Sequence, residues 1–140
     1  SGSLLNHKRD ALMEHKMRSR DVTAKLVEMN EKIEIANEKR SKIQSYLNNL
    51  EQAMYDVEKQ LQDHSQTSAL QGGRINISHA RKKRRLDEEY EQILNKIELK
   101  RDELNTAEVE SNRLEKGKIS LNDEMRGLEK SLVGILVEQQ

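Results

Sequence analysis

Apolar residues return at alternating steps of three and four along the first half of the chain. This spacing places them on one stripe of an α-helix and is typical of coiled coils, in which positions a and d of a seven-residue repeat form the seam. Position a is taken by Leu5, Leu12, Leu26, Ile33, Leu47, Met54 and Leu61, and position d by Val22, Met29, Ala36, Ile43, Leu50 and Val57. Between Val22 and Leu61 only Arg40 interrupts the series. The pattern predicts one long helix over residues 4–71.

A second series of the same kind fills the other half of the chain. Position a is taken by Tyr90, Ile97, Leu104, Met125 and Leu132, and position d by Leu86, Ile93, Ala107, Leu114, Leu121, Leu128 and Ile135. Polar residues interrupt this series at Lys100, Ser111 and Lys118. The pattern predicts a second long helix over residues 78–140.

The two series are out of phase by one residue, so a break separates the predicted helices. Gly72 suits the left-handed position that ends a helix, and Gly73 follows it directly. Ser78 or Asn76 can cap the next helix, because short polar side chains accept hydrogen bonds from the first free amides. Residues 72–77 are therefore predicted to be a turn.

Charges beside the seam favour antiparallel pairing. In a parallel homodimer each g residue faces the e residue five positions later on the partner. The second helix would then oppose like charges in the pairs Lys96–Arg101, Glu103–Glu108, Glu110–Glu115 and Glu124–Glu129. An antiparallel pair sets a basic g row against a mainly acidic one: Arg18, Lys25, Lys32 and Lys39 against Glu89, Glu103, Glu110, Glu124 and Glu138. The predicted fold is all-α, two long helices in an antiparallel coiled coil.

The polar interruptions also narrow the register. Core layers pair residues whose numbers have a constant sum, and the two series allow 140 or 147. The sum 140 buries Arg40 against Lys100, whereas 147 places them opposite Ala107 and Leu47, past which each cation can extend to solvent. We therefore expect 147, which also predicts the ion pairs Lys25–Glu124, Lys39–Glu110 and Lys16–Glu129. A helical hairpin and a domain-swapped antiparallel dimer both satisfy this pairing.

Composition limits the chemistry available to the chain. Of its 140 residues 34% are hydrophobic and 36% charged, which suits long helices sharing a narrow seam better than a thick core. Cysteine and proline are absent, and no stretch approaches the ~18 apolar residues of a membrane span. Residues 1–3, Ser-Gly-Ser, are interpreted as a remnant of cloning. We expect an intracellular protein, cytoplasmic (cytoskeletal) or nuclear, with no membrane span.

The sequence predicts no enzyme, no cofactor, no metal and no small-molecule substrate. A pair of helices lacks the concave, water-excluding site that catalysis needs. Three histidines occupy d positions, but in the register of sum 147 His15, His64 and His79 face Leu132, Lys83 and Ser68. We therefore expect no two of these histidines to meet.

A run of cations follows the predicted turn. Together with Arg74 it is formed by Arg81, Lys82, Lys83, Arg84 and Arg85. Cations at the start of a helix oppose the helix dipole, so their placement costs stability. They are candidates for binding an anionic surface, such as nucleic acid, acidic lipid headgroups or an acidic filament; the alternative is a solvated end of the coiled coil without a ligand.

The opposite end of the predicted hairpin carries more apolar residues than one seam can bury. We call this set the apolar end: Leu4, Leu5, Leu12, Met13, Leu132, Val133, Ile135, Leu136 and Val137. Val133 and Val137 lie off the a/d stripe. Either a longer parent chain continues there, or two hairpins associate into a four-helix bundle.

The sequence thus favours a non-enzymatic coiled-coil oligomerisation or scaffold module of a larger cytoskeletal, motor-adaptor or chromosome-organising protein. It would act as a stiff spacer and protein–protein interaction surface, with a second copy or another helical protein as partner. The alternative function is an anion-binding module that docks through the cations after the turn.

Overall fold

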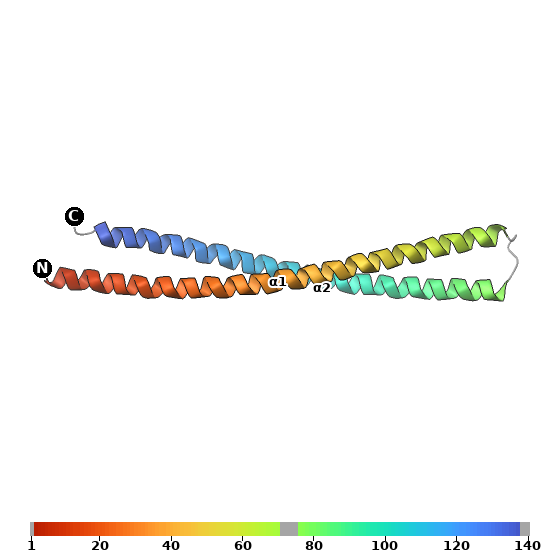
Figure 1. The fold of residues 1–140 in the computed structure, drawn as a ribbon, viewed down its shortest axis with the longest axis horizontal. Coiled ribbons are helices and arrows are strands. Elements are labelled where there is room, and N and C mark those ends of the chain that lie inside the picture. Colours follow the sequence, from red (N-terminus) through yellow and green to blue (C-terminus); the bar gives the residue numbers. More distant parts are fainter. Residues whose placement is uncertain (1, 71–75, 138–140) are drawn as a thin grey trace. The chain divides into compact units, whose positions relative to one another are not determined.

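The chain folds into two long α-helices. The computed structural model describes residues 2–70 and 76–137, which form α1 (Gly2–Leu70) and α2 (Ile77–Val137) (Figure 1). These bounds match the predicted helices 4–71 and 78–140 to within three residues at each end. The predicted turn residues Gly72 and Gly73, like Arg74, lie outside the described residues.

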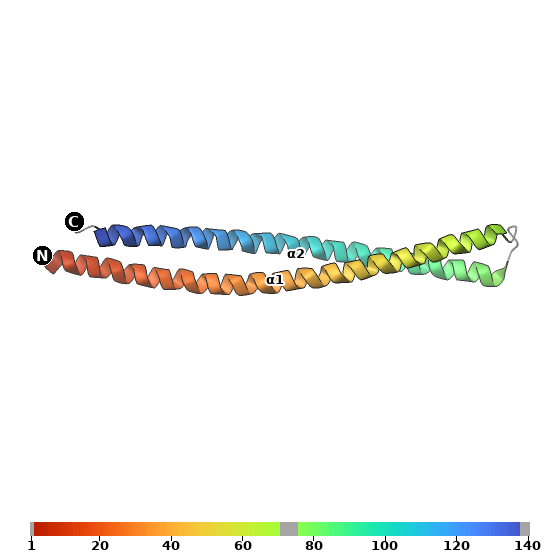
Figure 2. The same cartoon turned by 45° about the horizontal axis from the view of Figure 1, so that its top comes forward.

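The helix pair divides into two units, each built from a stretch of α1 and a stretch of α2. We call Ser1–Glu38 with Val109–Gln140 the terminal unit, and Lys39–Glu108 the central unit. Within each unit the α1 and α2 stretches run alongside each other in both views (Figures 1 and 2). Residues far apart in sequence therefore share one core in each unit, which makes the chain a helical hairpin.

The central unit contains the larger buried cluster. Every member occupies a predicted a or d position: Ile43, Leu47, Leu50, Val57, Leu86, Ile93, Ile97 and Ala107. Val57 and Ile97 are the most completely buried of these side chains. Full burial of such an aliphatic side chain stabilises a fold by about 1.5–3 kcal/mol, so this seam supplies much of the hydrophobic stabilisation.

The terminal unit has a thinner core in the same frame. Val22, Ile33, Leu114 and Leu128 are buried, together with the polar Ser111. Leu5 is exposed at its predicted a position. The other core positions are half-buried, among them Leu12, Leu26, Met29, Leu121, Met125, Leu132 and Ile135. The predicted a/d frame is thus confirmed in both units.

Contacts between the helices run in opposite order along α1 and α2. In the central unit, Ser68 Oγ lies 2.6 Å from His79 Nε2, and Glu51 pairs with Arg101 at 3.6 Å. In the terminal unit, Ser19 contacts Met125, three residues before Leu128, whose carbonyl receives the hydrogen bond of His15. In both units residue numbers rise on one helix as they fall on the other, the order of an antiparallel pair. Ser68 and His79 are direct partners in the register of sum 147.

The cations at core positions reach solvent, as expected. Lys100 keeps 32% of its side chain exposed, lies 5.0 Å from the centre of the Tyr46 ring and pairs with Glu103 at 2.9 Å. Arg40 is exposed. Arg40 and Lys100 are thus not buried against each other. Avoiding that contact was the reason for expecting the register of sum 147.

Asn76 provides the cap of α2. Its side-chain oxygen accepts hydrogen bonds from the backbone amides of Ser78 at 3.0 Å and His79 at 3.4 Å, and its carbonyl accepts from Ala80 at 2.9 Å. Ser78, the other predicted cap, lies inside the first turn of the helix. The Asn76 side chain, two residues before Ser78, satisfies the first free amides of the helix.

Candidate interaction surfaces

The apolar end remains partly uncovered when the two helices pair. Leu4, Leu5, Met13, Val133, Leu136 and Val137 are exposed, each by about half of its surface or more. Of the four members at core positions, Leu12, Leu132 and Ile135 are half-buried, and Leu5 alone is exposed. One seam between two helices has no room for the side chains that point away from it, so these remain available to a further partner.

Exposed apolar side chains of the terminal unit collect on one side of the helix pair. In an antiparallel coiled coil the e positions of both helices flank the same side of the seam, with the b positions next to them. Five of the exposed apolar residues sit at e or b positions: Met13, Val27, Ile119, Val133 and Leu136. We call this side the e/b side. In the central unit the exposed Tyr46 and Tyr55 lie on opposite sides, so the concentration is particular to the terminal unit.

A groove of about 350 Å³ lies on this side of α1. Leu12, Met13 and Met17 form its apolar part. Its remaining lining residues are three cations, Arg9, Lys16 and Arg20. The sequence interpretation placed Leu12 and Met13 in the apolar end but overlooked these cations, although their spacing of seven and four residues follows the heptad frame.

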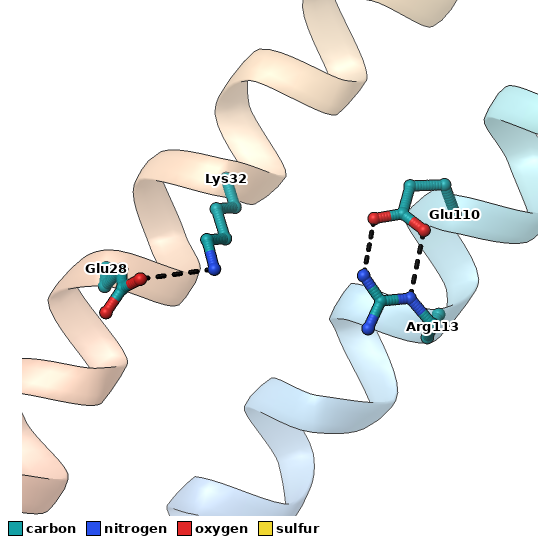
Figure 3. Close-up of polar contacts among 4 residues, drawn as sticks. All are labelled: Glu28, Lys32, Glu110 and Arg113. Carbon is teal, nitrogen blue, oxygen red and sulfur yellow. Dashed lines mark hydrogen bonds and ion pairs between the residues drawn. The ribbon is translucent and has the colours of Figure 1, made fainter.

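The opposite side of the terminal unit, formed by the g and c positions, carries two ion pairs within single helices. Lys32 pairs with Glu28 at 3.2 Å, and Arg113 binds both carboxylate oxygens of Glu110 at 2.6 and 2.9 Å (Figure 3). The hydrogen bonds that Arg113 donates to Glu110, and then the negative charge of Glu110, raise the pKa of Arg113 above its ordinary value. Ion pairs within one helix thus engage residues that were predicted to pair between the helices. Partners three or four residues apart on one helix lie close together whatever the register of the two helices.

The cations after the turn are placed as the sequence predicts. Arg81, Lys82, Lys83, Arg84 and Arg85 lie in the first turns of α2, and all five are exposed. Lys83 pairs with Asp87 of its own helix at 3.8 Å. Exposed side chains on a helix offer charge to an anionic surface, but they form no enclosed site.

Two histidines meet in the central unit, contrary to the expectation that none would. The rings of His64 and His79 stack with their centroids 3.5 Å apart, and His64 is 7% exposed. His64 Nε2–H donates to the backbone carbonyl of His79 at 2.7 Å. The carbonyl of His79 points along α2 toward Lys83, the residue that was predicted to face His64. The layer prediction failed because it paired residues at one level and ignored how far an imidazole ring reaches.

The described residues form no group of three or more His, Asp or Glu side chains suited to a metal ion. Within the same part of the chain, neither helix has a stretch long and apolar enough to cross a membrane. Comparison with protein-family models, curated proteins and solved structures gives no match.

Proposed function

We propose that this chain is a non-enzymatic coiled-coil module that joins helical proteins. The observation that carries the proposal is the apolar end, where side chains such as Val133 remain 60% exposed although the seam beside them is filled. Monomeric soluble proteins seldom expose contiguous apolar surface unless a partner covers it. The module would act as a spacer within a larger cytoskeletal, motor-adaptor or chromosome-organising protein and bind a second copy or another helical protein at this end.

Sedimentation equilibrium tests the form in which the partner is a second copy. We expect the mass of the wild type to rise above 16.3 kDa with concentration, and Val133→Glu with Leu136→Glu to restore the single-chain mass. The matched control is Ile35→Glu with Leu99→Glu, which places the same charges on exposed apolar residues elsewhere. A wild type that stays at the single-chain mass would restrict the partner to another helical protein.

The second candidate function is anion binding by the five cations from Arg81 to Arg85. The observation that favours it is that all five side chains are exposed at the start of α2. Changing all five to Gln should abolish salt-sensitive binding to heparin, DNA or anionic liposomes and leave helicity intact, because phosphate and sulfate contacts depend on charge. Wild-type chain that binds none of these three probes would remove this function.

A further inference from the structure

The groove on the e/b side of the terminal unit combines apolar side chains with positive charge. Leu12, Met13 and Met17 are flanked by Arg9, Lys16 and Arg20, and none of the described residues that line it is acidic. Among the described residues, these three cations form no ion pair or hydrogen bond. Two cations on the opposite side, Lys32 and Arg113, pair with acids of their own helices. The positive charge of the groove is therefore left for a partner to neutralise.

The dimensions of the groove suit an α-helix. Its lining residues span three turns of α1, about 17 Å at 1.5 Å per residue. Across the seam, the exposed Val133 and Leu136 occupy b and e positions of α2, on the same side of the pair. A third helix lying between the two would bury these side chains together with Met13, as in the core of a helical bundle.

Charge argues against a second copy of this chain as the best occupant. A two-fold symmetric contact sets the same patch against itself, so Arg9, Lys16 and Arg20 would approach their own counterparts. Near the groove the e and b positions of α2 add the acid Glu129 and the cation Arg126, which pairs with Asp123 of its own helix. The patch is thus predominantly positive, and like charges brought together weaken association.

We infer that this groove binds an acidic amphipathic helix, one with apolar residues on one face and Asp or Glu residues flanking that face. The inference rests on the proposed interaction function and specifies its partner. Apolar residues of the bound helix cover Leu12, Met13 and Met17. Its carboxylates, repeated at intervals of seven and four residues, meet Arg9, Lys16 and Arg20. The apolar contact supplies affinity, and the charges select the partner.

Two synthetic peptides of about 20 residues, or ~30 Å as helices, test this. Both carry Leu at coiled-coil core positions; one carries Glu at the flanking positions and the other Lys. Fluorescence anisotropy at about 0.15 M salt should show the Glu peptide binding the wild-type chain at least about tenfold more tightly. Arg9→Glu with Arg20→Glu should reverse the preference. Arg18→Glu with Lys25→Glu, the same change on the opposite side, should leave it intact, and circular dichroism should show equal helicity throughout.

The outcomes separate the partner chemistry from the interaction function. Equal binding of both peptides, lost in Val133→Glu with Leu136→Glu, would overturn the acidic partner and keep the interaction surface. If neither peptide binds, the acidic partner is overturned. If in addition the chain does not self-associate, the interaction function is overturned too. Binding of phosphatidylserine vesicles in place of the Glu peptide would assign the groove to a lipid surface and overturn the inference.

Discussion

The imidazole rings of His64 and His79 stack face to face, with centroids 3.5 Å apart and planes inclined by 11°. The contact joins α1 to α2 in the central unit, and Ser68 extends it through a 2.6 Å hydrogen bond to His79 Nε2. Three polar side chains thus pack the helix pair in a region where the apolar series has ended.

Replacing His79 with alanine is expected to lower the free energy of unfolding by about 1–2 kcal/mol, because the ring stack and the bond to Ser68 are lost together. Chemical denaturation followed by circular dichroism measures the change. His7→Ala is the control, since His7 is exposed. Equal effects of the two substitutions would show that the stack contributes nothing.

The seam could be predicted from the sequence because it depends on periodicity alone. Every buried residue from Val22 to Val57 on α1 lies at a predicted a or d position. The partners of charged and polar side chains could not be predicted from periodicity. Glu110 binds Arg113 of its own helix, and His64 reaches the carbonyl of His79. The partner of a long side chain depends on its conformation and not only on the core layer to which it belongs.

The candidate surface was predicted in part for the same reason. Val133 and Val137 stand out from the sequence because they are apolar and off the seam. The cations Arg9, Lys16 and Arg20 do not, since charged residues are ordinary on exposed faces of a coiled coil. Their significance comes from the groove of α1 that they share with Met13 and Met17 in the structure.

Gly127 offers a simple stabilising substitution. An alanine Cβ at this helical position would meet nothing within 4 Å. Gly127→Ala should therefore raise the free energy of unfolding by up to about 1 kcal/mol, through the lower conformational entropy of the unfolded chain. Gly117→Ala should gain less, because its Cβ would lie 2.9 Å from Met29 Cε, which must shift. Thermal denaturation of the two variants, compared with wild type, decides the order.

Ser111 is a polar residue within the core of the terminal unit. It is 4% exposed, and among the described residues its hydroxyl has no hydrogen-bond partner. Ser111→Ala should raise the free energy of unfolding by about 1 kcal/mol, because an unsatisfied buried hydroxyl is removed. Ser131→Ala, at an exposed position of the same helix, should gain only the small difference in helix propensity. Urea denaturation that gave both variants the same gain would contradict the burial cost.

The cap of α2 is tested by comparing two neighbouring residues. Asn76→Ala should cost about 1 kcal/mol, since the amides of Ser78 and His79 lose their side-chain acceptor. Ser78→Ala should change stability little, because Ser78 donates only its backbone amide to this cap. Hydrogen exchange at the start of α2 provides a local measurement. Faster exchange in Ser78→Ala than in Asn76→Ala would assign the cap to the serine.

A disulfide at residues 47 and 100 tests both the register and the hairpin. The chain has no cysteine, so Leu47→Cys with Lys100→Cys introduces its only two thiols, which can bridge within a chain or between chains. Lys100 already lies over the ring of Tyr46, the neighbour of Leu47, which places the backbones close enough for a bridge to be expected.

Arg40→Cys with Lys100→Cys is the control, because it would bridge only in the register of sum 140. Under dilute oxidising conditions the first variant should form a monomeric bridged species on a non-reducing gel, and the second should not. Dimers formed by the first variant at every concentration would instead show that α1 of one chain pairs with α2 of another.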